Sequence, residues 1–267
     1  MKGESDMIMR KKNKTNAIKE TISASSLILS KDTPFAVKES YKAIRTNILH
    51  ILKDKDKKWF SVTSPCPGTG KTTVAVNLGI TFAELGRKTV VIDADMRKPM
   101  IARLFSVHGK KGLSEFLNGD DDGAEVVETG HNNLYAVTAG EIPDNPSELL
   151  SSDRFALLLS KLSETFDYII VDTPPVGMVT DAAVISAAVS GTMLVIKQNY
   201  TDKERFDATV QALKKVDANI LGYVLNAVDE KKYSYRYGRY SPYYGGYYGG
   251  YYGREKKEAE KQKAMSK

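Results

Sequence analysis

The chain has 267 residues, 42% of them hydrophobic, and a net charge of +6 at neutral pH. This length suffices for one domain of roughly 200 residues with flanking segments. The single cysteine, Cys66, excludes an internal disulfide and favours a reducing, cytoplasmic compartment. The three histidines lack the spacing of metal ligands, and no apolar run is long enough to cross a bilayer.

The positive charge is concentrated at the two ends of the chain. Residues 1–20 carry a net charge of +3 and residues 231–267 carry +7, which leaves about −4 for the residues between them. Basic ends around a slightly acidic middle are typical of flexible arms that contact an anionic membrane surface or an acidic partner. We therefore expect no nucleic acid as a partner.

The predicted elements begin with a flexible basic arm over residues 1–33, which are polar and lack a sustained period. Pro34 starts a helix over about 35–52. Short apolar runs then alternate with helical stretches, which predicts an α/β domain over 34–230 whose mostly parallel sheet is covered by helices on both faces. The expected strands are 59–63, 89–92, 167–171, 192–196 and 220–225, and the expected helices are 71–85, 147–163, 179–188 and 202–215.

A glycine-rich loop, SPCPGTGKTT, follows the first expected strand and opens the next helix. This is the setting of a phosphate-binding loop (P-loop), although Pro65 stands at the first glycine of the GxxxxGK[ST] pattern. Lys71 can reach nucleotide phosphates, the Thr72 hydroxyl can bind Mg²⁺, and the site should be open to solvent without nucleotide. The expected nucleotide-binding residues are Gly68, Thr69, Gly70, Lys71, Thr72 and Thr73.

Aspartates end two of the expected strands. TVVIDADMRKP carries Asp93 and Asp95, and YIIVDTPP carries Asp172. The carboxyl ends of parallel strands border the ligand crevice of an α/β sheet, so these carboxylates should lie close to Lys71. Either motif alone is also compatible with a helix cap, but together the acids supply what Mg²⁺ and a phosphoryl acceptor need. The candidate metal ligands are Thr72, Asp93, Asp95 and Asp172.

Two further positions near these motifs have more than one interpretation. Arg97 either neutralises phosphate charge or forms a structural salt bridge. Asn226 and Asp229, in VLNAVDE after the last strand, are candidates for contact with the nucleotide base, and the alternative for Asn226 is that it simply ends the strand.

Ten of the fifteen tyrosines lie between Tyr233 and Tyr252, in YSYRYGRYSPYYGGYYGGYYG. Repeated Gly-Gly steps and Pro242 oppose a regular helix or strand, which predicts a disordered, tyrosine-rich basic tail over residues 231–267. A low-complexity adhesive tail and a stacking platform for single-stranded nucleic acid are alternative interpretations of this stretch.

In combination, these motifs resemble those of the bacterial protein-tyrosine kinases of capsular and exopolysaccharide loci. That family has a Walker A loop, a second motif ending in DxDxR, a Walker B motif ending in DxxP, and a C-terminal tyrosine cluster. The matching stretches are PCPGTGKT, VVIDADMR, IIVDTPP and the tail, and the similarity spans about residues 35–252, including PSELLSS at 146–152. DxDxR and the tail are its specific parts.

The resemblance implies a P-loop enzyme that uses ATP and Mg²⁺ to phosphorylate its own tail between subunits. Lys71, Asp93, Asp95 and Asp172 would be catalytic, with Asp95 or Asp93 accepting the phenolic proton and Asp172 in the metal shell. The implied acceptors are Tyr233, Tyr235, Tyr237, Tyr240, Tyr243, Tyr244, Tyr247, Tyr248, Tyr251 and Tyr252.

The resemblance also implies partners. The family's ExxRxxR motif, which supports a ring-like homo-oligomer, corresponds to Glu39, Lys42 and Arg45, for which a solvated charged helix face is the alternative. A transmembrane polysaccharide co-polymerase would recruit the cytoplasmic kinase to the inner face of the membrane and activate it, and a cognate phosphotyrosine phosphatase would reverse the modification.

Two other functions are compatible with the P-loop motifs. A nucleotide-gated ATPase scaffold without kinase activity would use the same site but leaves the tyrosine cluster unexplained. An ATPase that binds nucleic acid through its Tyr/Arg tail is disfavoured by the acidic middle of the chain.

Overall fold

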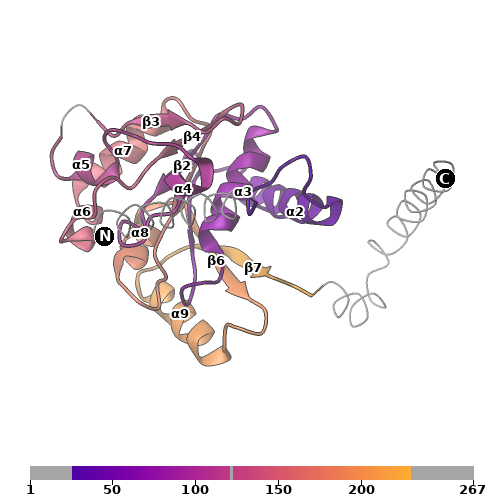
Figure 1. The fold of residues 1–267 in the computed structure, drawn as a ribbon. Helices are drawn as coiled ribbons and strands as arrows, with labels where there is room; N and C mark the ends of the chain where they lie inside the picture. The colour runs from indigo at the N-terminus through magenta and orange to yellow at the C-terminus, as the bar shows by residue number, and fades with distance from the viewer. Residues whose placement is uncertain (1–25, 121–122, 230–267) are drawn as a thin grey trace, which may run out of the picture. The chain divides into compact units, whose positions relative to one another are not determined.

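The computed structural model describes residues 26–120 and 123–229 and shows a layered α/β arrangement (Figure 1). Within this part of the chain, one sheet has the strand order β3-β4-β2-β5-β1-β6-β7, and all of its pairings are parallel except β3 with β4. The strands are β1 (Trp59–Thr63), β2 (Thr89–Asp93), β3 (Val126–Glu128), β4 (Leu134–Val137), β5 (Tyr168–Asp172), β6 (Gly191–Lys197) and β7 (Ile220–Asn226).

Helices lie on both faces of the sheet, which confirms the predicted fold class. They are α2 (Phe35–Ile51), α3 (Lys71–Ala83), α4 (Ile101–Phe105), α5 (Leu113–Leu117), α6 (Pro146–Leu150), α7 (Asp153–Ser163), α8 (Asp181–Ala188) and α9 (Lys203–Lys215). The chain divides into units at residues 1–226 and 227–267, and the predicted tail lies outside the described residues.

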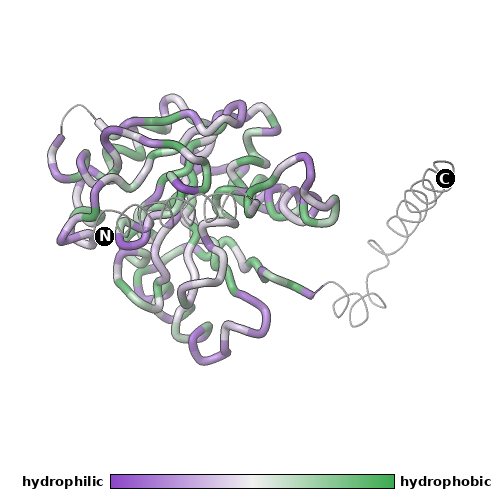
Figure 2. Tube along the Cα trace, in the orientation of Figure 1, coloured by the Kyte–Doolittle hydropathy of each residue, from purple (hydrophilic) through white to green (hydrophobic). Residues whose placement is uncertain are grey.

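Alternating strand residues build two separate cores. In β2, Val91 packs with residues of α2, α3 and α4, whereas Val90 and Ile92 face the layer that contains α5, α6 and α7. In β5, Ile170 joins the first core and Ile169 the second. Successive side chains of a strand point to opposite faces of the sheet, and in β2 and β5 both faces are buried. The sequences of these central strands are therefore continuous apolar runs, as their hydropathy in Figure 2 shows.

Helix α3 packs closely against the sheet because it contains Gly79. A Cβ atom at this position would lie 2.7 Å from Val91 and 3.0 Å from Leu134, too close for an ordinary contact. Nearly the whole helix is buried. The helix that follows the P-loop is therefore held rigidly on the strands that carry the aspartates.

Three details differ from the prediction. The β3–β4 pair and the short helices α4 and α5 were not expected, and the single helix expected over 147–163 is divided into α6 and α7. The Ser151 and Ser152 hydroxyls donate to the carbonyls of Ser147 and Leu149, and Ser152 is extended, so local side-chain bonding ends α6.

The end of the predicted N-terminal arm packs onto the domain. The Leu29 side chain is only 6% exposed and belongs to the core around α3. Its amide donates to Asn77 Oδ1 at 2.8 Å, and Asn77 Nδ2 donates to the Leu27 carbonyl at 3.1 Å. The described residues before Pro34 are thus anchored to the helix that follows the P-loop.

Helices long and apolar enough to span a membrane are not found in the described ranges.

Candidate active site

The P-loop connects β1 to α3 at the carboxyl edge of the sheet. Gly68 and Gly70 have φ angles of +77° and +91°, which L side chains rarely adopt, so both glycines are required by the backbone. The Gly70 carbonyl accepts the first helical bond, from the Val74 amide. The Thr63 hydroxyl donates to the Pro174 carbonyl at 2.9 Å and fixes the end of β1 against the segment after β5.

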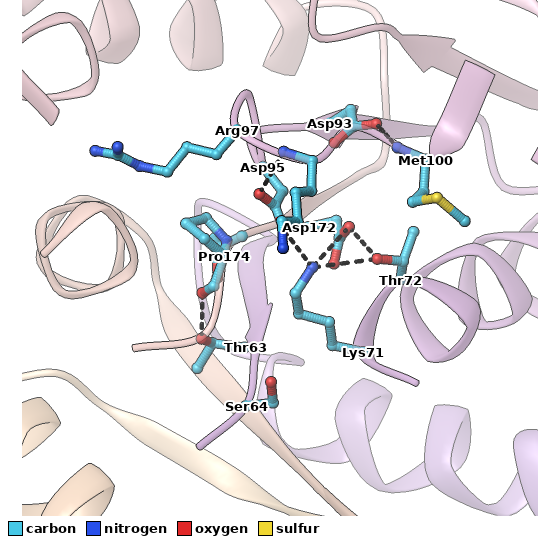
Figure 3. Close-up of polar contacts among 12 residues, drawn as sticks. Thr63, Ser64, Lys71, Thr72, Asp93, Asp95, Arg97, Met100, Asp172 and Pro174 are labelled. Atoms are coloured by element: carbon cyan, nitrogen blue, oxygen red, sulfur yellow. Dashed lines mark hydrogen bonds and ion pairs between the residues drawn. The ribbon is translucent and has the colours of Figure 1, made fainter. Parts of the chain in front are cut away.

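Lys71, Thr72, Asp95 and Asp172 meet beside this loop, as predicted from the two strand-end motifs (Figure 3). Lys71 Nζ lies 2.8 Å from Asp95 Oδ2, 3.6 Å from Asp172 Oδ2 and 3.2 Å from the Thr72 hydroxyl. Lys71 is only 9% exposed, so the expectation of an open, solvent-filled site is wrong for this side chain. Its ammonium group serves as counter-ion to two carboxylates.

The charge of Lys71 is maintained in this setting. Burial alone would lower the pKa of its ammonium group, but the carboxylates of Asp172 and Asp95 more than offset that effect and hold the pKa above its usual value. Lys71 is therefore a full positive charge at the start of a helix, where nucleotide phosphates would bind.

Asp93 lies beside Asp172 in the sheet register, but its carboxylate is directed to backbone amides. Its Oδ2 atom accepts hydrogen bonds from the Met100 and Ile101 amides, both at 2.9 Å, and so caps the start of α4. Burial, followed by the nearby Asp172 carboxylate, raises the pKa of Asp93 to about 7. Asp93 is thus an aspartate that acts as a helix cap, which was one of the interpretations of these motifs.

Asp172 ends β5 and is fully buried. Burial raises its pKa to about 6 against the opposing attraction of Lys71. The Thr72 hydroxyl donates to its Oδ2 atom at 2.6 Å, whereas its Oδ1 atom is buried without a hydrogen-bond partner among the described residues.

These oxygens fit a magnesium ion bound with a nucleotide. The described residues contain no group of three His, Cys, Asp or Glu side chains suited to hold a metal by themselves. Mg²⁺ in phosphoryl-transfer sites needs only one or two protein oxygens, because phosphates and water complete its octahedral shell. Asp172 with its bare Oδ1 atom and the adjacent Thr72 hydroxyl provide such a pair.

Arg97 points away from the lysine cluster in Figure 3 and forms a salt bridge. Its Nε atom lies 3.0 Å from Asp181 Oδ2, and Asp181, at the start of α8, is fully buried. Ser147 of α6 also donates to Asp181. Of the two interpretations of Arg97, the structure therefore shows the structural salt bridge. Asp181 was missed because it belongs to no local motif, and nothing in the PSELLSS stretch connects its Ser147 with Arg97.

Side chains at the ends of β6 and β7 contact the P-loop from outside. Asn226, predicted to contact the nucleotide base, donates to the Thr69 carbonyl at 2.8 Å. Lys197 and Tyr200, which the sequence did not single out, donate to the carbonyls of Gly68 and Pro67 at 3.3 Å and 3.0 Å.

The three predicted oligomerisation residues make contacts within the described chain. Lys42 and Glu39 form a salt bridge of 2.7 Å on α2, with side chains that are 43% and 30% exposed. Arg45 donates to the Thr81 carbonyl of α3 at 2.7 Å. Arg45 thus helps to attach α2 to the domain, in addition to any contact with a neighbouring subunit.

Comparison with known proteins places this geometry in a known family. Residues 57–221 match the AAA domain family. The chain is 37% identical over 203 residues to tyrosine-protein kinase YwqD of Bacillus subtilis, covering 76% of this chain and 85% of that protein. The crystal structure of the chimerical protein CapA2B2 superposes with a TM-score of 0.68 at 34% identity, covering 74% and 86% of the two chains. The kinase domain of Escherichia coli tyrosine kinase ETK gives the same TM-score and identity over 72% and 75%.

Proposed function

The chain belongs to the bacterial tyrosine-protein kinases, and we propose that it transfers the γ-phosphoryl group of ATP to tyrosines of its own C-terminal tail, between subunits. The observation that carries this proposal is the convergence of Lys71, Thr72, Asp95 and Asp172 next to a P-loop. Phosphoryl transfer depends mainly on positioning and charge neutralisation, and this cluster supplies both.

Each residue has a distinct task in the proposed reaction. Lys71 exchanges its carboxylate partners for the β- and γ-phosphates, and the P-loop amides bind the same phosphates. Thr72 and Asp172 would hold Mg²⁺, which neutralises phosphate charge when bound. Asp93 positions the segment between β2 and α4 through its cap.

The transfer step forms one bond and breaks another. The tyrosine hydroxyl oxygen attacks the γ-phosphorus, the bond from that phosphorus to the β–γ bridging oxygen breaks, and ADP leaves. The phenolic proton moves to a carboxylate. Asp95 is better suited to this task than Asp93, because Asp95 is 5% exposed and Asp93 is fully buried with one oxygen accepting two amides.

Incubation of the purified protein with γ-labelled ATP and Mg²⁺, followed by mapping of labelled residues, tests the proposal. We expect label on tyrosines 233–252. Asp95→Asn should reduce the transfer rate much more than it reduces ATP affinity, since a base acts only when the phenol loses its proton. An equal loss in transfer rate and in ATP affinity would mean that Asp95 acts only in binding. ATP hydrolysis without labelled tyrosine would favour the scaffold function instead.

The proposal extends to assembly and cellular role. A ring-like oligomer would use the face of α2 that carries Glu39 and Lys42, whose partly exposed side chains are accessible to a neighbour. A transmembrane polysaccharide co-polymerase would recruit the kinase to the inner membrane face, a phosphatase would oppose it, and the output would be control of capsular or extracellular polysaccharide synthesis. Adding the cytoplasmic segment of that membrane protein should increase tail labelling, and unchanged labelling would argue against it as the activator.

A further inference from the structure

Three consecutive carbonyl groups of the P-loop accept hydrogen bonds from side chains outside the loop. Tyr200 Oη donates to the Pro67 carbonyl at 3.0 Å, Lys197 Nζ donates to the Gly68 carbonyl at 3.3 Å, and Asn226 Nδ2 donates to the Thr69 carbonyl at 2.8 Å. The next carbonyl, that of Gly70, accepts the first bond of α3. Every peptide group from Pro67 to the start of the helix is therefore held by its oxygen.

Holding a peptide oxygen also orients the amide of the following residue. A trans peptide group is planar, and its C=O and N–H bonds point in opposite directions; no cis peptide occurs among the described residues. With the carbonyls of residues 67–69 directed at the three donors, the amides of Gly68, Thr69 and Gly70 point to the other side of the loop. Those are the amides expected to bind phosphates.

The donors themselves come from a rigid part of the fold. Lys197 and Asn226 are paired in the register of β6 with β7. The Lys197 carbonyl accepts the amides of Tyr200 and Thr201, and the Thr201 hydroxyl accepts the Lys197 amide. The Lys197 ammonium group also lies 5.1 Å from the centre of the Tyr200 ring. These contacts form a tight turn that presents two donors to the loop.

Gly70 of the P-loop allows the approach of Asn226. A Cβ atom on Gly70 would clash with Asn226 Nδ2, whereas one on Gly68 would make an ordinary contact of 3.4 Å with Tyr200 Oη. Gly70 is therefore needed both for its positive φ and for the close contact with Asn226.

We propose that Lys197, Tyr200 and Asn226 form a carbonyl clamp that orients the amides of Gly68, Thr69 and Gly70 for the nucleotide phosphates. They are positioning residues that act through the loop. The inference rests on the proposed ATP site, but it does not require that tyrosine be the acceptor. It also gives Asn226 a role other than the predicted contact with the base.

The test measures nucleotide affinity directly, so that it remains valid if tyrosine phosphorylation fails. Calorimetric Kd values for Mg·ATP and for inorganic pyrophosphate with Mg²⁺ would be compared for the full chain and its variants. Tyr200→Phe removes only the hydroxyl. Tyr223→Phe is its matched control, because Tyr223 is similarly exposed, at 52% against 49%, and its ring packs on Phe206 of α9.

Tyr200→Phe should raise both Kd values about threefold to tenfold, the effect of one net hydrogen bond, and Tyr223→Phe should leave both unchanged. Lys197→Met should weaken the binding of both ligands, whereas Lys197→Arg, which keeps a hydrogen-bond donor, should retain most of the affinity. Asn226→Ser should weaken both by the same factor, because the clamp acts on phosphates.

Three results would overturn the clamp. One is unchanged pyrophosphate affinity in Tyr200→Phe and Lys197→Met. Another is a loss for Asn226→Ser with ATP alone, which would indicate the base contact. The third is an equal loss in Tyr223→Phe, which would indicate a general effect on the fold.

Discussion

Replacing Lys71 by methionine should destabilise the folded protein as well as abolish phosphoryl transfer. The ammonium group is the counter-ion of Asp95 and Asp172, at 2.8 Å and 3.6 Å, and the two acidic side chains are only 7% and 1% exposed. Methionine has a similar length but no charge, so both carboxylates would lose this partner. A substitution at Lys71 is therefore not structurally neutral in this protein.

The size of the effect follows from burial and protonation. Removing one partner of a buried ion pair typically costs about 3–5 kcal/mol. Protonation limits that loss. The pKa of Asp172 is already about 6, so at pH 7 this carboxylate can be protonated for the free energy of one pH unit, about 1.4 kcal/mol. The contribution of Asp172 to the loss of stability cannot exceed that amount. Asp95 supplies the rest, and a total of about 3 kcal/mol would lower Tm by about 6–12 °C.

The pH dependence has a definite sign. Without Lys71 the folded-state pKa of Asp172 rises further above its unfolded value of 3.8. The folded variant then binds more protons than the unfolded chain, so its stability falls as pH rises through the folded-state pKa of Asp172. The deficit relative to the original protein should therefore be larger at pH 8 than at pH 5.5.

Thermal unfolding in EDTA at pH 8, 7 and 5.5 measures the deficit. Lys71→Arg keeps the charge and is the matched control, and Lys71→Met combined with Asp95→Asn removes one of the two uncompensated charges and should recover part of the loss. Equal melting temperatures for the original protein and Lys71→Met at pH 8 would refute the counter-ion role. Undiminished tail labelling by Lys71→Met would refute the assignment of the site.

Three more outcomes are expected. Arg97→Ala should lower the free energy of unfolding by about 1–3 kcal/mol in denaturant titrations, because it leaves the buried Asp181 carboxylate without its cation; unchanged stability would favour a role confined to phosphate. Asp93 has a folded pKa of about 7, so its ionisation destabilises the fold as pH rises from about 4 to 8; Asp93→Asn, which can still accept the two amides, should melt higher than the original protein at pH 8 and not at pH 5. A Lys71→Met chain that keeps its tail should become labelled when mixed with an active chain truncated after Glu230, and label confined to competent chains would indicate transfer within one chain.

The parts of the fold that could be predicted are those with local signals. The largely apolar strands predicted at 89–92 and 167–171 are each followed directly by an aspartate, and burial on both faces of a parallel sheet requires such apolar runs. The P-loop could be placed because its glycines, lysine and threonine are contiguous. Strand β3 could not, since it has three residues and two of them are exposed.

The sequence allowed a helix cap for an aspartate and a salt bridge for Arg97, but the partners in these contacts lie outside the motifs. Asp93 caps α4 from seven and eight residues away, and Arg97 pairs with Asp181 across 84 positions. The donors to the P-loop carbonyls lie 129 to 157 positions further along the chain. The strand order places β6 beside β1 and β7 beside β6, and so brings these donors to the P-loop. The residue spacing within a single motif does not reveal that order.

The charges at the site fit the proposed binding of a divalent cation. Asp93, Asp95 and Asp172 with Lys71 have a formal charge of −2 when all are ionised, and burial already raises the pKa of Asp93 and Asp172 to relieve part of it. A nucleotide triphosphate brings further negative charge and competes with Asp95 and Asp172 for the same ammonium group. Lys71 cannot neutralise both. We infer that Thr72 and Asp172 would hold Mg²⁺ when Lys71 turns to the phosphates, so that the exchange of partners by one lysine would couple metal binding to nucleotide binding.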